Sequence, residues 1–169
     1  MARLTTTLFI AAALVATAGC SKKHPAELPP APGGPPPPPA AAAPQDSVAP
    51  GSRADFERSV TSNTIHFALD KYDVDDASRA ILDSQAAWLA KYPNVTVSLE
   101  GHCDERGTRE YNLGLGDRRA NAAKNYLAAR GIAPGRISTI SYGKERPIAL
   151  GSDEASWAQN RRAVTIVPN

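Results

Sequence analysis

A proline-rich stretch determines which part of this chain can fold. Residues 21–52 contain most of the fifteen prolines in the sequence, among them an unbroken run at 35–39, interleaved with alanine. Such a segment has too little apolar surface to offset its ordering entropy, and proline-rich chains stay extended. We therefore expect residues 20–52 to form a disordered linker and residues 53–169 to form the folded domain.

The segment ahead of the linker has the features of an export signal. Residues 8–16 are apolar, and small residues at 18–19 precede Cys20. The apolar run is far shorter than the roughly 20 residues that span a bilayer, so we interpret residues 1–19 as a cleaved signal peptide. A cysteine at this point resembles the bacterial lipoprotein signal. That resemblance implies a lipid on Cys20, and Ser21 behind it implies delivery to the outer membrane.

Cysteine content and charge narrow the choice of function. Cys20 and Cys103 are the two cysteines of the sequence, so a lipidated Cys20 leaves Cys103 without a partner and no disulfide framework is possible. The remaining domain of about 115 residues is long enough to build its own core. The formal net charge is +2 and no long basic run is present, so nucleic acid is not indicated as a partner.

The segment after the linker alternates between strand and helix patterns. Alternation of apolar and polar residues predicts strands at 64–69, 95–101, 136–142 and 162–167. Apolar residues at helical spacing predict helices at 76–92, at 112–130 and, capped by Ser152, up to residue 160. The order β-α-β-α-β-α-β predicts an α+β domain whose helices pack on one mixed sheet of about four strands.

A dense charged loop joins the second strand to the long helix. Asp104 lies in this loop, and Arg119 follows Leu115 by four residues, on the inward stripe of the helix. Arg118 is rotated away by about 100° and is expected at the surface. A carboxylate accepts an ammonium and a guanidinium pairs with a carboxylate, so Asp104 and Arg119 suit a small zwitterion. The alternative is a structural ion pair of Arg119 with Asp104 or Glu100.

Several motifs in this domain resemble one known family. They lie at residues 67, 70–73, 101–102, 104–108, 111–112, 115–116, 118–121, 141–147 and 160–164. Together they span about residues 60–167, and they resemble the OmpA C-terminal-domain-like family, in particular its peptidoglycan-associated lipoproteins. Cys103 stands where these proteins often have alanine, and the sequence leaves open whether its thiol is buried or exposed.

The resemblance implies an OmpA-like fold and non-covalent binding of peptidoglycan through the meso-diaminopimelate of its stem peptide. It implies TolB and other Tol proteins as partners, and a lipid-anchored outer-membrane protein that faces the periplasm and acts in envelope integrity and in membrane invagination at division. No cofactor is implied besides the lipid on Cys20. The binding residues that it implies are Asp104, Arg119, Asn112, Thr108, Leu115, Asp70 and Lys71.

Some of these residues have a second interpretation from position alone. Asn112, Thr108 and Asp70 are also suitable as cap or turn residues. If the long helix begins near residue 112, Arg119 lies within its first turns. The helix N-terminus would then add backbone N–H groups for the same anion.

Three rival functions fit the sequence less well. His102 and Cys103 suggest a nucleophile and base, but adjacent strand side chains point to opposite faces, and the sequence has no nucleophile elbow. A metal site at His66, His102, Cys103 and Asp104 matches no zinc spacing, and the aspartates at 70–76 lack the glycine and glutamate of a calcium loop. A purely structural lipoprotein would bind no wall ligand. We therefore predict a binding protein that is not an enzyme and holds no metal.

Overall fold

The computed structural model describes residues 48–168. The predicted signal peptide, the predicted lipid site at Cys20 and the linker up to residue 47 lie outside the described residues. Along the rest of the chain the elements are α1 Arg53–Ser59, β1 Thr64–His66, α2 Asp76–Lys91, β2 Val97–His102, α3 Arg109–Ala129, the 3-10 helix η1 Pro134–Arg136, β3 Ile137–Gly143, α4 Glu154–Asn160 and β4 Arg162–Ile166.

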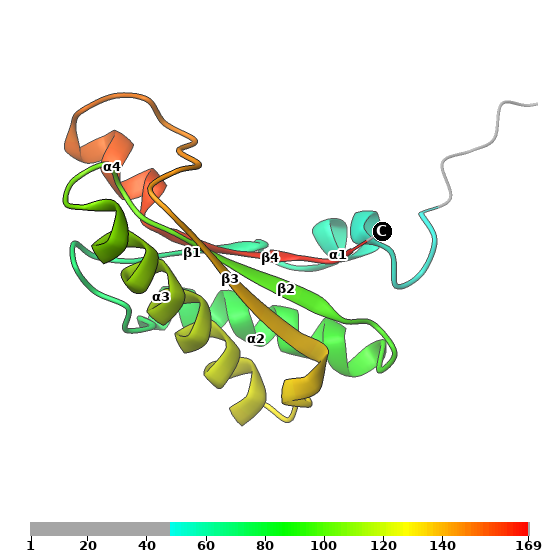
Figure 1. The fold of residues 1–169 in the computed structure, drawn as a ribbon. Coiled ribbons are helices and arrows are strands. Elements are labelled where there is room, and N and C mark those ends of the chain that lie inside the picture. Colours follow the sequence, from blue (N-terminus) through cyan, green and yellow to red (C-terminus); the bar gives the residue numbers. More distant parts are fainter. Residues whose placement is uncertain (1–47, 169) are drawn as a thin grey trace, which may run out of the picture. The chain divides into compact units, whose positions relative to one another are not determined.

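The four strands form one mixed sheet in the order β1-β4-β2-β3. β4 pairs antiparallel with β1 and with β2, whereas β2 and β3 are parallel. The helices α2 and α3 lie side by side along the sheet (Figure 1). The predicted α+β fold, with helices packed on a mixed four-stranded sheet, is therefore confirmed.

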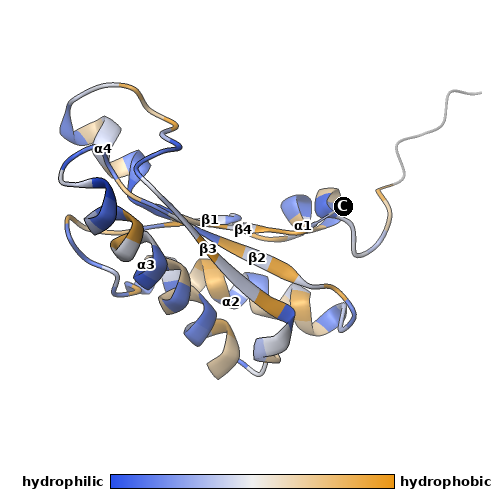
Figure 2. Cartoon of the chain, viewed as in Figure 1, coloured by the Kyte–Doolittle hydropathy of each residue, from blue (hydrophilic) through white to orange (hydrophobic). Residues whose placement is uncertain are grey.

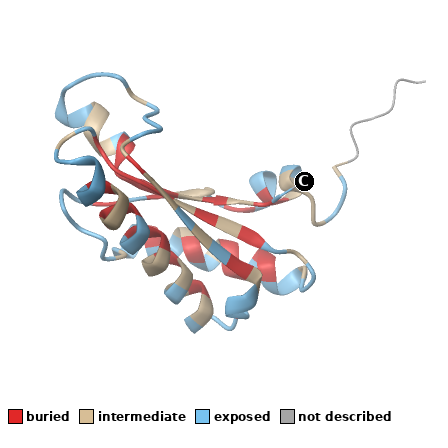
Figure 3. Cartoon of the chain, viewed as in Figure 1, coloured by how far each residue is buried: buried red, intermediate tan, exposed pale blue. Residues whose placement is uncertain are grey.

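The hydrophobic core fills the space between this sheet and the two long helices. Figure 2 shows apolar residues along β2 and α2, and Figure 3 shows that most of β2 and β4 and the inward helix faces are buried. The core includes Ile65, Phe67, Leu82, Leu89, Val97, Leu99, Ala123, Leu127 and Ile137. Burial of side chains of this size stabilises a fold by about 1.5–3 kcal/mol each.

Helix ends follow local capping chemistry. Asp75 accepts a hydrogen bond from the backbone N–H of Ser78, so α2 begins at Asp76, where the predicted helix also begins. The start predicted for α3 was three residues late, because Thr108 caps this helix ahead of its first buried residues. The cap predicted for α4 was also wrong. Asp153, and not Ser152, accepts the N–H of the first turn there.

Two further departures lie at the start of the domain. The first helix, α1, was not predicted because Phe56 is its one buried residue, and a single apolar position gives no periodicity. The Phe56 ring packs edge-on against Trp88 of α2, with 4.9 Å between ring centroids. The strand predicted at 64–69 ends at His66, because the chain turns back where the N–H of Lys71 donates to the Ala68 carbonyl.

A close backbone contact sets the position of α3 on the sheet. Gly101 of β2 faces Gly116 of α3 so closely that a Cβ on Gly101 would clash with the Gly116 carbonyl oxygen. On the same side of Gly116, the Ser141 hydroxyl of β3 donates to the Leu113 carbonyl at 2.7 Å. This contact brings the N-terminal half of α3 beside the end of β2, where the charged loop begins.

Candidate functional site

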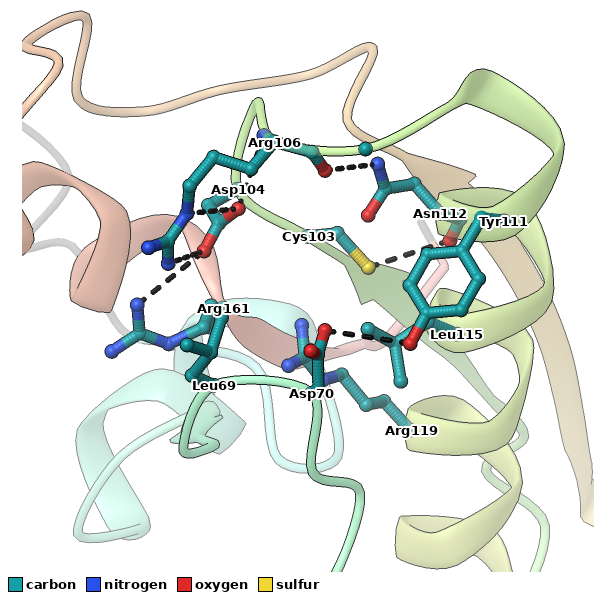
Figure 4. Close-up of a pocket in the computed structure, with 11 residues that line it drawn as sticks. Leu69, Asp70, Cys103, Asp104, Arg106, Tyr111, Asn112, Leu115, Arg119 and Arg161 are labelled. Carbon is teal, nitrogen blue, oxygen red and sulfur yellow. Dashed lines mark hydrogen bonds and ion pairs between the residues drawn. The ribbon is translucent and has the colours of Figure 1, made fainter.

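A cavity of about 290 Å³ opens where β2 ends (Figure 4). It lies between the turn after β1, the charged loop after β2 and the first three turns of α3. Asp104, Arg106 and Arg161 lie on one side of it, and Tyr111 and Asn112 lie on the other. The residues that line it are Leu69, Asp70, Cys103, Asp104, Arg106, Gly107, Tyr111, Asn112, Leu115, Arg119 and Arg161.

Asp104 is a buried carboxylate held by two arginines. Its Oδ1 accepts the backbone N–H and the Nε–H of Arg106, each at 3.2 Å, and its Oδ2 accepts Nη2 of Arg106 at 2.6 Å. Nη1 of Arg161 lies 3.4 Å from the same Oδ2. Burial opposes ionisation, but the hydrogen bonds from Arg106 outweigh it and lower the pKa of the Asp104 carboxyl below its usual value. Asp104 is therefore a fixed negative charge in the cavity wall.

Arg119 is a buried guanidinium whose partners are all backbone carbonyls. It is 0% exposed, and it donates to Lys71 O at 2.9 Å, His102 O at 2.8 Å and Ala68 O at 3.2 Å. No carboxylate among residues 48–168 lies within ion-pair distance of it, so the structural ion pair with Asp104 or Glu100 does not form. Burial lowers the pKa of Arg119, but a guanidinium stays charged in proteins.

The position of Arg119 corrects one sequence prediction. It lies near the middle of α3, which has 21 residues and begins at Arg109. The rise from Arg109 to Arg119 is about 15 Å. The N–H groups at the helix start are therefore too far away to bind the same carboxylate as Arg119.

The other predicted site residues divide into two groups. Asp70 and Leu115 line the cavity, as does Asn112, whose amide donates to Arg106 O at 2.7 Å and so holds the charged loop. Thr108 and Lys71 do not line it. Thr108 is the cap of α3, and Lys71 contributes its carbonyl to Arg119 while its side chain is exposed.

Asp70 combines both interpretations that the sequence allowed. Its φ is +55°, a left-handed conformation that aspartate tolerates better than most residues, so it is a turn residue. Its Oδ1 also lies 3.4 Å from the Tyr111 hydroxyl across the cavity mouth. The turn after β1 is thus joined to α3 above the pocket.

Sequence reasoning missed Arg106 and Arg161. Arg161 donates to Phe67 O at 3.0 Å and to Glu154 Oε1 at 2.6 Å, besides its contact with Asp104. No local pattern marks it, because Arg161 lies between the end of α4 and the start of β4, and its neighbour Arg162 is also buried.

Cys103 and His102 lie on opposite sides of the sheet. Cys103 is buried in the cavity wall, its Sγ lies 3.4 Å from Asn112 O, and burial raises the pKa of the thiol. His102 stacks on Tyr142 with 5.5 Å between centroids. The open question of the thiol is thereby resolved in favour of burial. No group of three or more His, Cys, Asp or Glu within residues 48–168 is arranged to hold a metal ion.

Comparison with known proteins identifies the family. The profile of the OmpA family matches residues 66–161. The peptidoglycan-associated lipoprotein of Rhizobium meliloti is 52% identical over 121 residues, which cover 72% of this chain and 68% of that protein. The chain belongs to the OmpA family. Within it, the chain groups with the peptidoglycan-associated lipoproteins, as the motifs predicted.

Further relatives agree with this assignment. The peptidoglycan-associated lipoprotein of Haemophilus influenzae is 52% identical over 102 residues, covering 60% of this chain and 67% of that protein. A crystal structure of the peptidoglycan-associated lipoprotein from Burkholderia pseudomallei has a TM-score of 0.64 and 41% identity, and covers 68% of this chain and 100% of its own. These relatives are named as lipoproteins and not as enzymes, which confirms the prediction that this family member is not an enzyme.

None of the helices within residues 48–168 is both long enough and apolar enough to cross a membrane.

Proposed function

We propose that this OmpA-family chain binds peptidoglycan non-covalently, and that the cavity at the end of β2 takes the meso-diaminopimelate of the stem peptide. The observation that carries this proposal is the charge of Arg119. A buried guanidinium without a carboxylate partner is costly, and a ligand carboxylate would supply the missing counterion. Three carbonyls do not use up the N–H donors of a guanidinium, so donors remain for that carboxylate.

Asp104 supports the same ligand from the opposite side. Its carboxylate is ionised and buried, and it can accept the ammonium that meso-diaminopimelate carries on the same carbon as its free carboxylate. Leu115 and Leu69 add apolar surface for the methylene chain between the two ends of the ligand. The names of the relatives at about half identity support the peptidoglycan part of the proposal.

The cellular part of the proposal rests on the family resemblance. The chain would be anchored in the outer membrane by a lipid on Cys20, with residues 20–52 as a tether and the domain facing the periplasm. It would act with TolB and other Tol proteins in envelope integrity and in drawing the outer membrane inward at division.

The test is co-sedimentation of residues 21–169 with purified peptidoglycan sacculi. We expect the wild type to pellet with the sacculi, and Asp104→Ala and Arg119→Ala to stay in the supernatant after circular dichroism has shown that they are folded. Matched controls are Asp83→Ala and Arg109→Ala, which remove exposed residues from surface ion pairs away from the cavity. Wild type that stays in the supernatant would overturn the proposal.

A second measurement tests the ligand itself. Calorimetric titration with a stem peptide that ends in meso-diaminopimelate should give binding, whereas the same peptide with lysine should bind far more weakly. Lysine keeps the ammonium and lacks only the carboxylate assigned to Arg119. Equal affinity for the two peptides would remove Arg119 from the ligand site.

A further inference from the structure

The carboxylate proposed to receive the ligand is already saturated by the protein. A carboxylate offers roughly four lone-pair directions. Those of Asp104 face the backbone N–H and Nε–H of Arg106 at Oδ1, and Nη2 of Arg106 and Nη1 of Arg161 at Oδ2. An ammonium that arrives at Asp104 therefore finds no free acceptor direction, and one of the present donors must leave.

The two arginines on Asp104 are held very differently. The Arg161 side chain is 7% exposed and is fixed at three points, by Asp104, by Phe67 O and by Glu154. The Arg106 side chain is 34% exposed, and Asp104 is the one group within hydrogen-bond distance of its guanidinium in the described part of the chain. Arg106 is therefore the donor that a ligand can displace.

We infer that Arg106 is an internal substitute for the ligand ammonium, which occupies Asp104 in the free protein and is displaced when the ligand binds. This inference rests on the proposed function, because it concerns the same pocket and the same ammonium-bearing ligand. The backbone N–H of Arg106 stays on Oδ1, and only the side chain moves. The exchange replaces one cation on Asp104 by another, so the buried carboxylate is never left without a partner.

The Arg106 side chain has an alternative interaction site next to Asp104. Its guanidinium already lies 4.0 Å from the centre of the Trp157 ring, and its Nη1 lies 4.0 Å from Glu154 Oε2. The Trp157 indole is held in turn by its N–H, which donates to Glu105 Oε1 at 3.0 Å. A small rotation away from Asp104 keeps the cation over this ring and brings it closer to Glu154.

The exchange makes Arg106 a specificity residue. A simple amine that binds Asp104 forms one charge-assisted contact and breaks the equivalent contact of Arg106, so its binding has no net free-energy advantage. A ligand with an ammonium and a carboxylate on one carbon also gains an ion pair with Arg119. No carboxylate among the described residues pairs with Arg119, so the ligand displaces no ion pair there. Arg106 thus favours an amino-acid zwitterion over a plain amine.

The experiment is calorimetric titration of the meso-diaminopimelate stem peptide into residues 21–169 as wild type, Arg106→Met and Asp104→Ala. The matched control is Arg109→Met, an exposed arginine paired with Glu145. Since Arg106→Met removes the competitor, we expect it to bind the peptide about tenfold more tightly than wild type, the change of one charge-assisted contact. It should also bind the simple amine cadaverine measurably, which the wild type does not.

A second readout needs no substitution. In a ¹H–¹⁵N spectrum of the wild type, the Nε–H of Arg106 should be protected from exchange with water, and saturating peptide should abolish that protection and shift the indole N–H of Trp157. The Nε–H of Arg109 should not change.

The outcomes separate this inference from the proposed function. If wild type binds and Asp104→Ala does not, but Arg106→Met binds equally or more weakly, the exchange is wrong and the wall ligand stands. The same holds if Arg106 keeps its protection in the complex. If wild type does not bind the peptide at all, the proposed function fails, and this inference fails with it.

Discussion

The segment from Val97 to Asp104, which comprises β2 and the first two residues after it, has two halves with opposite surroundings. Val97 and Leu99 are packed among apolar side chains of the core, whereas Cys103 and Asp104, just beyond the end of the strand, are buried among guanidinium groups. Apolar burial stabilises the fold without specific partners, but a buried ion pair contributes little net stability and is costly when one partner is lost. The comparison teaches that the residues that stabilise this domain and the residues of the proposed ligand site lie at opposite ends of the same segment.

The largest effect should come from the contact that joins the two halves. Gly101→Ala places a Cβ against the Gly116 carbonyl, and because the Cβ is bonded directly to the backbone and the carbonyl is part of it, neither can rotate aside. We expect the free energy of unfolding to fall by more than about 3 kcal/mol, measured by urea denaturation. The control is Gly135→Ala, where a Cβ would meet nothing within 4 Å, and which should change stability by less than about 0.5 kcal/mol. Equal urea midpoints for the two variants would contradict this packing.

The next effect should separate binding from stability. Asp104→Asn keeps an acceptor for Arg106 and Arg161 but removes the charge that the ligand ammonium needs. We expect wall-peptide affinity to fall by about 3 kcal/mol, within the usual range for breaking a buried charge pair. The free energy of unfolding should fall by about 2 kcal/mol, less than in Gly101→Ala, because the apolar core is untouched and Arg161 keeps Phe67 O and Glu154 as acceptors. A loss of stability as large as that of Gly101→Ala would contradict the view that the charged half of the segment contributes less to stability than the apolar half.

The sequence predicted the core half well and the charged half only in part. Periodicity located the four strands and the long helices, and it placed Arg119 on the inward stripe four residues after Leu115, where it is fully buried. It also predicted a charge on the loop after β2, and Asp104 is that charge. Local pattern was enough for these features because each depends on spacing within one element.

The spacing of residues along the sequence could not predict the partners of the buried charged side chains. Asp104 binds Arg161, which is 57 residues away, and Arg119 binds carbonyls at Ala68, Lys71 and His102. These pairs follow from how the turn after β1, the end of β2 and the start of β4 meet in space. The alternative interpretation, an ion pair of Arg119 with Asp104 or Glu100, is wrong, and backbone carbonyls accept the hydrogen bonds of its guanidinium instead.

A smaller effect should appear with pH on the outer face of the same strand. His102 is buried with both ring nitrogens unpaired among the described residues. Burial, followed by the positive charges of Arg162 and Arg146, lowers its pKa to about 4, although Glu100 Oε2 lies 3.8 Å from its Nε2. The unfolded chain, with an ordinary histidine pKa near 6.5, then binds more protons than the folded one between pH 6.5 and 4. The stability that His102 contributes is thus present above about pH 6.5 and is lost as pH falls to 4.

The measurement is urea denaturation at pH 7 and pH 4.5 for wild type and His102→Phe, which keeps a ring to stack on Tyr142. Wild type should lose about 2 kcal/mol more than the variant over this interval. Equal losses would show that His102 does not titrate in this range, and that the acid sensitivity of the domain arises from its carboxylates.

The smallest effect should come from Cys103, which lines the pocket and yet has the properties of a core residue. It is 3% exposed, its thiol lies 3.4 Å from the Asn112 carbonyl oxygen, and burial raises the pKa of the thiol, so little thiolate is present at pH 8. We expect Cys103→Ala to lower the free energy of unfolding by less than about 1 kcal/mol and to leave wall binding intact.

Labelling with iodoacetamide tests the burial of Cys103 directly. In residues 21–169 Cys103 is the one thiol, so iodoacetamide at pH 8 should label the chain in urea and leave the folded protein almost unlabelled. Rapid labelling of the folded protein would mean that solvent reaches Cys103 through the cavity. The apolar, well-packed half of the segment would then end nearer to Leu99.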